Sequence, residues 1–329
     1  MSAEQFPAEL LDFLLGSEGI RRILSTVPTP GNPIALTGLA GGLKGLVIGL
    51  YAQRLGRQVV FIGRETETVR DVWNDALLVL GPEDVMYAAE HGEIGRIEFA
   101  AFDDRPAERA EQLRGLAEQP RKLVVTQPSS AFAAVPSSEE LVEHAIRVAA
   151  GSPLNREETV RRLTLGGFER STYVGAVGEF SVRGGILDVY PVGFERPVRI
   201  EFLGDLVESI REFDPLSQRS IRMLPSVSFL TALFLDKDAF PRRQTLFDHL
   251  SPDAVLFLDE PEAIEQEAQV LGKSEDLDRV CRSFPVFRIP ALLTARMQAH
   301  DAGATPQPAF NGSVGMLRRH VHTLSSRGT

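Results

Sequence analysis

The first part of the chain alternates between short apolar runs and longer segments in which apolar residues recur every three or four positions. The apolar runs predict buried strands at residues 33–36, 58–63 and 122–128, and the longer segments predict helices at residues 46–55, 65–80 and 105–119. Strands that alternate with helices typically form a parallel sheet with helices on its faces. We therefore expect an α/β layer here, although residues 85–104 show neither period.

The pattern changes after Val135. Asn155, followed by two glutamates, predicts the start of a helix over residues 155–167. Residues 171–214 then alternate between apolar and polar positions and are interrupted by turns that contain glycine. This pattern is typical of antiparallel hairpins, so we expect a domain of a different class, packed on few helices.

The α/β alternation returns from about Leu224. Its predicted elements are a helix at residues 242–250, a strand at 254–259, a helix at 260–271 and an amphipathic helix at 313–327. No strand follows the last helix, so we expect the chain to be a fragment of a longer protein. We predict three domains, covering residues 1–135, 136–225 and 226–329, in which the first and third share a parallel sheet and the second is an inserted α+β domain.

The composition mainly excludes certain classes of protein and certain kinds of site. No apolar run approaches the ~20 residues of a membrane span, and the N-terminus lacks the basic start of a signal peptide, so we expect a cytoplasmic protein. The lone Cys281 excludes an intrachain disulfide and a multi-cysteine zinc site. The six histidines do not fall in metal-ligand spacing, and we predict no metal site and no catalytic residues. A net charge of −10 argues against a DNA-contacting scaffold, because phosphate binding needs a basic surface.

The stretch ALTGLAGGLKGLVIG, residues 35–49, is similar to a phosphate-binding P-loop, which needs G-x-x-x-x-G-K-[ST] between a strand and a helix. With Gly38 as the first glycine, Lys44 holds the lysine position, but Leu43 replaces the second glycine. Gly45 replaces the hydroxyl residue. A leucine Cβ crowds the phosphate, and a glycine offers Mg²⁺ no ligand. We therefore predict a degenerate P-loop that joins strand to helix and binds no nucleotide cofactor.

The stretch AVLFLDEPE allows two interpretations of Asp259 and Glu260. In one, the aspartate after an apolar strand binds Mg²⁺ and the glutamate activates water, as in a Walker B motif. In the other, the acidic pair caps the helix that follows, where Glu260 and Glu262 favour the positive end of the helix dipole. Because a degenerate P-loop leaves no metal to bind, we favour the second interpretation.

Arginines occupy strand positions of the predicted antiparallel sheet. In PVRIEFLG, the two-residue period puts Arg199, Glu201 and Leu203 on one face. Phe202 lies on the other face, and Arg183 precedes a Gly-Gly turn. One face is core, and the other faces solvent or a partner. Arginine beside apolar residues is typical of protein-binding surfaces.

The segments GEFSVRGGILDVYPVG and RPVRIEFLGDLVESIREFDPLSQRS resemble the second domain shared by bacterial transcription-repair coupling factors (Mfd) and the excision-repair protein UvrB. The later stretches LDEPE and FNGSVGMLRR resemble the coupling factors more. This resemblance implies the domain layout of UvrB: a degenerate RecA-like domain, made of parts 1a and 1b, with domain 2 inserted. It also implies loss of ATPase activity and of the aromatic hairpin with which UvrB clamps damaged DNA, in agreement with the short stretch at residues 86–104.

In that family, domain 2 recruits UvrA through two arginines and nearby apolar residues. Carried over by motif, these are Arg183 in SVRGG and Arg199 in PVRIEF, with Phe202 and Leu203 beside them, where the family often has two aromatics. The resemblance further implies that the family's own C-terminal domain masks domain 2. RNA polymerase binding and ATP-dependent DNA translocation are implied to reside in regions beyond residue 329.

Two functions of different class follow. The first, which we favour, is a non-catalytic module that recruits UvrA and so links stalled RNA polymerase to nucleotide excision repair. The second is a UvrB-like, ATP-dependent DNA repair enzyme that uses Lys44, Asp259 and Glu260 in an unconventional nucleotide site. The replacements at Leu43 and Gly45 argue for the first.

Overall fold

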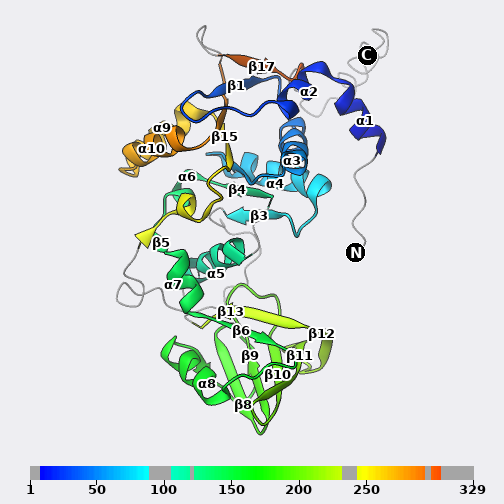
Figure 1. Cartoon of the computed structure of the whole chain (residues 1–329), viewed down its shortest axis with the longest axis vertical. Coiled ribbons are helices and arrows are strands. Elements are labelled where there is room, and N and C mark those ends of the chain that lie inside the picture. The colour runs from blue at the N-terminus through cyan, green and yellow to red at the C-terminus, as the bar shows by residue number, and fades with distance from the viewer. Residues whose placement is uncertain (1–7, 89–104, 119–121, 232–242, 293–297, 305–329) are drawn as a thin grey trace, which may run out of the picture.

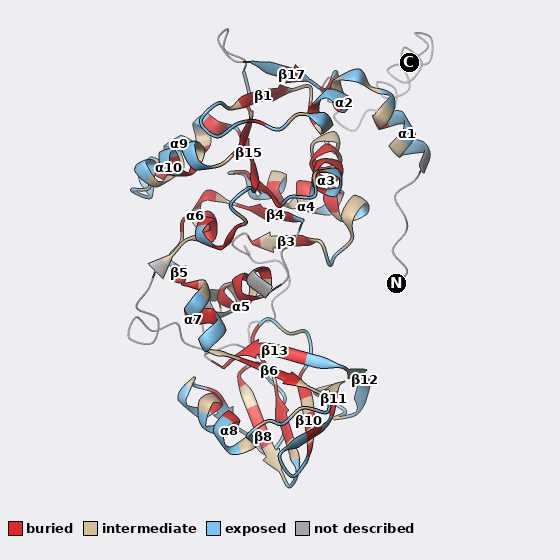
Figure 2. Cartoon of the chain, in the orientation of Figure 1, coloured by how far each residue is buried: buried red, intermediate tan, exposed pale blue. Residues whose placement is uncertain are grey.

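Two sheets organise the part of the chain that this computed structural model describes, namely residues 8–88, 105–118, 122–231, 243–292 and 298–304 (Figure 1). The larger sheet consists of parallel strands in the spatial order β17 (Ala299–Asp301), β1 (Ile34–Thr37), β16 (Val286–Ile289), β15 (Val255–Asp259), β2 (Val59–Ile62), β4 (Leu123–Thr126) and β3 (Val85–Ala88). Its central strands β15, β2 and β4 are buried along their whole length, as Figure 2 shows for β15 and β4. A strand buried on both faces reads as a continuous apolar run, which is why the sequence pattern found these strands.

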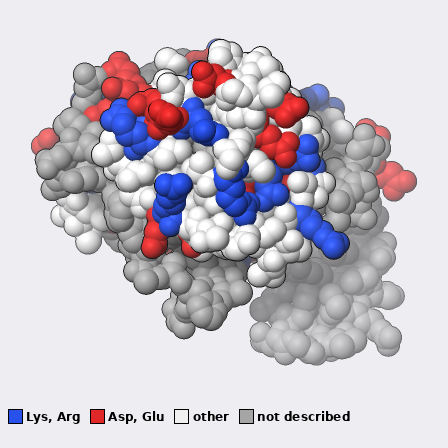
Figure 3. All heavy atoms as spheres, turned by 90° about the horizontal axis from the view of Figure 1, so that it is seen from below, with Lys and Arg blue, Asp and Glu red and all other residues white. Residues whose placement is uncertain are grey.

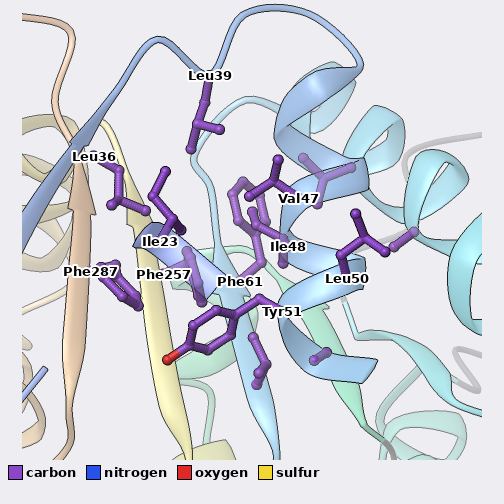
Figure 4. Packing of buried hydrophobic residues seen from close by; sticks show 14 of the residues in the cluster. Ile23, Leu36, Leu39, Val47, Ile48, Leu50, Tyr51, Phe61, Phe257 and Phe287 are labelled. Atoms are coloured by element: carbon purple, nitrogen blue, oxygen red, sulfur yellow. The ribbon is translucent and has the colours of Figure 1, made fainter. Parts of the chain in front are cut away.

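Helices cover both faces of the larger sheet. One face packs against α1 (Ala8–Gly16), α2 (Glu18–Ser25), α3 (Leu43–Leu55) and α4 (Thr66–Leu80), and the other against α5 (Arg105–Glu118), α6 (Pro128–Ala131), α9 (Pro261–Val270) and α10 (Ser274–Ser283). Neighbouring residues of one strand enter opposite cores, as Leu256 and Phe257 do. Tyr51 of α3 meets the ring edges of Phe257 and Phe287 at centroid distances of 5.2 and 5.5 Å (Figure 4).

In the part of the chain that the structure describes, the second sheet is formed by six strands that lie between β4 and β15 in the chain. Its strands lie in the order β12 (Ser220–Leu224), β11 (Leu206–Phe213), β10 (Val198–Leu203), β9 (Ile186–Val189), β8 (Glu179–Arg183) and β7 (Glu169–Arg170), antiparallel except for the β7–β8 pair. Helix α8 (Arg156–Leu165) contributes Leu163 to the core on one face of this sheet. The predicted cap is confirmed, because Oδ1 of Asn155 accepts a hydrogen bond from the N–H of Glu158 at 2.9 Å.

Short paired segments join the two sheets. Strand β6 (Ala145–Ala149) pairs with β13 (Ser226–Leu230), β5 (Val135–Pro136) pairs with β14 (Arg243–Gln244), and α7 (Ser138–Glu143) and the 3-10 helix η1 (Leu246–His249) lie next to them in the chain. Helix α5 lies between the larger sheet and β13 (Figure 1). There Arg114 donates to the carbonyl of Ser228 at 3.0 Å, and Glu111 accepts from the N–H of Leu230 at 2.9 Å.

The predicted fold class is confirmed, since a parallel α/β sheet carries an inserted region with an antiparallel sheet. The helix predicted at residues 242–250 is wrong: from Arg243 on, this stretch forms β14 and then the single turn η1. Thr245 caps this turn through a reciprocal pair of bonds with Asp248, and the extended backbone of Leu250 ends it after four residues.

Several elements lie where no prediction was made. Strands β3, β16 and β17 and helix α10 have no counterpart in the sequence reading, and α3 begins three residues before the predicted position 46. The helix predicted at residues 313–327 and most of the stretch 86–104 lie outside the described residues. The bounds of the three domains stay a prediction.

Candidate functional site

A buried carboxylate lies at the centre of one face of the inserted sheet. Asp188 of β9 has a side chain that is 1% exposed and binds both arginines singled out in the sequence. Its Oδ2 accepts from Nη2 of Arg183 at 2.5 Å, and its two oxygens accept from Nε and Nη2 of Arg199 at 2.7 and 2.9 Å. The face therefore carries two guanidinium groups held by one acid.

The register of the strands explains why Asp188 contacts both arginines. Asp188 lies directly opposite Arg199 on β10, and Arg183 ends β8, so all three side chains lie on the same face of adjacent strands. Sequence reasoning missed Asp188, although a lone acid within the apolar run ILDVY, between two arginine-bearing strands, was the available signal.

The two arginines differ in how much of them a partner can reach. The Arg199 side chain is 15% exposed, its guanidinium lies 4.5 Å from the ring centroid of Phe213, and its Nη1 donates to the carbonyl of Gln218 at 3.3 Å. The hydrogen bonds with Asp188 raise the pKa of Arg199 above its ordinary value. The Arg183 side chain is 36% exposed. Arg183 is thus the more accessible of the pair, whereas Arg199 mainly holds Asp188 in place.

The apolar candidates lie on opposite sides of the sheet. Phe202 is 8% exposed and belongs to the core, as the two-residue period predicts. Leu203 is 69% exposed and lies opposite Leu206 next to the β10–β11 turn. The register of β10 and β11 shifts between Glu201 and Phe202. Of the two, only Leu203 presents a large apolar surface to solvent.

Figure 3 views the end of the molecule that the inserted region forms. Basic side chains are spread over a mostly uncharged face, with acidic groups beside several of them. The local pairs include Arg211 with Glu201 at 3.0 Å, next to the Arg199 and Asp188 pair in the sheet. A surface of this kind combines guanidinium groups with exposed apolar area rather than forming a continuous basic track.

The degenerate P-loop is the second candidate site. Gly38 has a left-handed backbone with φ of 67° directly after β1, and Leu43 is the first residue of α3. Lys44 extends to the end of β15, where its Nζ lies 2.6 Å from Oδ1 of Asp259. The Lys44 and Asp259 side chains are 18% and 7% exposed, so the lysine and the aspartate of the two motifs neutralise each other.

Helix α4 packs closely on the first turn of α3. A Cβ on Gly45 would lie 2.5 Å from the Cβ of Asp75 and 3.0 Å from the Cα of Val72. The Asp75 carboxylate also lies near Gly42, and burial, followed by the charge of Asp71, raises the pKa of Asp75. A cavity of about 520 Å³ at this point is lined by residues that include Lys44, Asp71 and Asp75. Carboxylates here oppose the binding of a phosphate.

The capping part of the interpretation of the acidic pair after β15 is wrong, whereas Glu262 lies in the first turn of α9 as predicted. Asp259 does not cap α9, since it forms the ion pair with Lys44. Glu260 is the N-cap residue, but its backbone is left-handed with φ of 51° and its side chain makes no capping hydrogen bond. Among the described residues, no three His, Cys, Asp or Glu side chains converge to hold a metal ion, and no helix is long and apolar enough to cross a membrane.

Comparison with known proteins gives one family match and several relatives that share a single description. Residues 146–233 match the family model of the UvrB interaction domain. The transcription-repair-coupling factor of Myxococcus xanthus is 44% identical over 103 residues, which are 31% of this chain and 9% of that protein. Those of Bacillus subtilis strain 168 and Escherichia coli K12 are 27% and 26% identical over 216 and 208 residues, covering 66% and 63% of this chain and 18% of each relative.

This chain thus spans less than a fifth of the length of the curated relatives it matches. The matched family model covers the inserted sheet with its Arg183, Asp188 and Arg199 cluster, and the longer matches cover well over half of this chain. The chain is therefore homologous to the N-terminal region of transcription-repair coupling factors and carries a UvrB interaction domain.

Proposed function

We propose that this region recruits UvrA in transcription-coupled repair and does so through the face of the inserted sheet that carries Arg183 and Leu203. The observation that carries the proposal is the cluster around Asp188, which fixes an accessible guanidinium on the same domain that matches the UvrB interaction domain. The family of the relatives, coupling factors by name, supplies the biological setting.

The chemistry of the face fits a protein partner. Asp188 takes one amino nitrogen of Arg183, and the other N–H groups of this guanidinium are suited to a carboxylate on UvrA. Leu203, at 69% exposure, offers apolar area at the end of β10. Arg199 contributes by neutralising Asp188, which would otherwise repel an acidic partner. Phe202 supports the strand from within the core.

We further propose that this region is non-catalytic. Three features support this: Leu43 and Gly45 replace P-loop residues, Lys44 pairs with Asp259, and Asp75 of α4 packs beside the first turn of α3, where a phosphate would bind. DNA translocation and RNA polymerase binding then belong to other parts of the full-length protein, whose C-terminal domain would compete with UvrA for the same face.

The test is a titration of the chain with purified UvrA by calorimetry, alongside Arg183→Ala and Leu203→Ala. We expect the wild type to bind and each variant to lose at least about 1 kcal/mol of binding free energy. Arg161→Ala on α8 is the matched control, since Arg161 is 62% exposed and pairs with Glu158 away from this face. A wild type that does not bind UvrA, or an Arg183→Ala variant that binds equally well, would contradict the proposal.

The absence of catalysis has its own test. Titration with ATP and Mg²⁺, followed by fluorescence of a nucleotide analogue, should give no saturable binding in the micromolar range. Saturable binding that is lost in Lys44→Ala would instead support the UvrB-like enzyme.

A further inference from the structure

Tyr173 lies beside Arg183 and is exposed. Its ring lies 5.2 Å from the guanidinium carbon of Arg183, in cation–π contact. The side chain is nevertheless 62% exposed. The ring thus packs on Arg183 and is still mostly in contact with water. This is expected of a residue that contacts a protein partner.

The backbone around Tyr173 is fixed to the sheet. Ser171 Oγ donates to the carbonyl of Tyr173 at 2.7 Å, and Ser181 Oγ donates to the carbonyl of Thr172 at 3.0 Å. The next residue, Val174, is fully buried, and its carbonyl accepts from Nε2 of Gln218 at 3.0 Å. The exposed ring therefore projects from a segment held on both sides, so little conformational entropy is lost when a partner covers the ring.

The far side of the same segment is held as well. Oε2 of Glu179 accepts from the N–H groups of Gly175 and Ala176 at 2.7 and 2.9 Å. Glu179 and Ser181 both belong to β8, the strand that ends at Arg183. The strand that carries the arginine thus also positions the aromatic ring next to it.

We propose that Tyr173 is the aromatic anchor of the UvrA-binding face, the face of the inserted sheet that carries Arg183 and Leu203. Its ring packs against an apolar side chain of UvrA while Arg183 binds a carboxylate of UvrA. This inference rests on the proposed recruitment function. Tyr173 lies in the segment before β8, whereas the exposed Leu203 ends β10, so the aromatic and the aliphatic contact come from different elements.

The pair of side chains suits this task. Tyrosine and arginine dominate the energetics of protein interfaces, and contacts between them are strongest once a partner excludes water. Arg183 has already lost rotamer freedom to Asp188 and to the ring, so its guanidinium is oriented before binding.

The test compares UvrA binding by the whole chain with that of Tyr173→Ala and Tyr173→Phe, measured by calorimetry. We expect Tyr173→Ala to weaken binding at least about tenfold and Tyr173→Phe, which keeps the ring, to stay within about threefold of the wild type. Leu165→Ala is the matched control, because Leu165 is 74% exposed on α8, a helix that covers the opposite, core side of the sheet. Its affinity should equal that of the wild type.

The outcomes separate this inference from the recruitment proposal. If the wild type binds, Arg183→Ala weakens binding and Tyr173→Ala does not, recruitment stands and the role of Tyr173 is overturned. If the wild type does not bind UvrA, both are overturned. A thermal unfolding midpoint of Tyr173→Ala equal to that of the wild type shows that its loss of affinity arises at the interface and not from misfolding.

Discussion

At the scale of single residues, the exposed face of the inserted sheet depends on Asp188, because two arginines share its carboxylate. A buried acid of 1% exposure is tolerated only when cations and hydrogen bonds compensate for the lost hydration. Arg199 supplies most of this compensation and is itself mostly buried, which leaves Arg183 to face a partner. The two motif arginines therefore have different roles: Arg199 stabilises the buried acid, and Arg183 is accessible to a partner. Their spacing in the sequence does not reveal this difference.

The first prediction concerns this acid. Asp188→Asn keeps the shape of the side chain but removes its charge, so the guanidinium of Arg199 stays buried without a carboxylate. We expect the free energy of unfolding to fall by about 2–4 kcal/mol, measured by urea denaturation. Glu158→Gln is the matched control, because it neutralises the acid of the solvent-exposed pair with Arg161 and should change the free energy of unfolding far less than Asp188→Asn does. Equal losses in the two variants would show that Asp188 is not essential to the face.

At the scale of elements, the degenerate P-loop follows from how α3 and α4 pack. Gly45 and Gly49 lie one turn apart on α3, and a Cβ on either would approach α4 to 2.5 or 3.2 Å. A hydroxyl residue at position 45, as in a working P-loop, therefore does not fit while α4 lies here. The two helices share a close interface at the place where a nucleotide would bind.

This packing gives the second prediction. Gly45→Ser restores the missing hydroxyl but forces α4 away, so we expect a loss of about 1–3 kcal/mol of unfolding free energy and no gain of ATP binding. Gly115→Ala in α5 is the comparison, since nothing lies within 4 Å of the added Cβ, and it should stabilise the chain by about 0.5–1 kcal/mol. Chemical denaturation measures both. A Gly45→Ser variant as stable as the wild type would argue against a tight contact between the helices.

The third prediction concerns the join between α7 and η1. Ser138 Oγ and Nδ1 of His249 lie 2.9 Å apart, and Nε2 of His249 lies 3.1 Å from the carbonyl of Pro136. Burial lowers the pKa of His249, although the hydrogen bond with Pro136 opposes this effect. Above about pH 6.5 the ring is neutral in both folded and unfolded chains, and the full stability is present. As the pH falls further, the unfolded chain takes up a proton more readily, so stability is lost until the pH passes the lowered pKa of the folded state.

Unfolding free energies at pH 7.5 and 5.5 measure this effect. We expect the wild type to lose up to about 1.4 kcal/mol more than His249→Gln between these two values. If the two proteins lose stability in parallel, His249 does not contribute to the pH dependence.

Particular elements show what the sequence could and could not predict. The buried strands β2, β4 and β15 and the cap at Asn155 follow from local pattern and were predicted. The turn η1 was mistaken for a longer helix because Leu246, Phe247 and Leu250 have helical spacing, although the backbone is already extended at Leu250. Asp188 and Asp75 were missed because their importance depends on strand register and on helix packing, which bring together residues distant in sequence.

At the scale of the whole molecule, the inserted sheet is joined to the larger sheet partly through α5. Arg114 and Glu111 form an ion pair whose side chains are only 6% and 9% exposed. Arg114 also donates to Oγ and to the carbonyl of Ser228, while Glu111 accepts from the N–H of Leu230. One buried ion pair on α5 thus holds β13 by hydrogen bonds, and β13 is the strand through which the chain leaves the inserted sheet.

The last prediction tests the hydrogen bonds between α5 and β13. Arg114→Leu fills a similar volume but removes both bonds to Ser228 and leaves the buried Glu111 without this cation. We expect faster amide exchange along β13, at Leu230 above all, and a loss of about 2–4 kcal/mol of unfolding free energy. Arg161→Leu on α8 controls for the loss of an exposed arginine. Among the described residues, the contacts of Asp188, Arg183 and Arg199 include none from α5. Affinity for UvrA should therefore change little in Arg114→Leu, so that stability and recruitment are separated in one variant. Unchanged exchange along β13 would mean that the two sheets are held together by the β5–β14 and β6–β13 pairs rather than by α5.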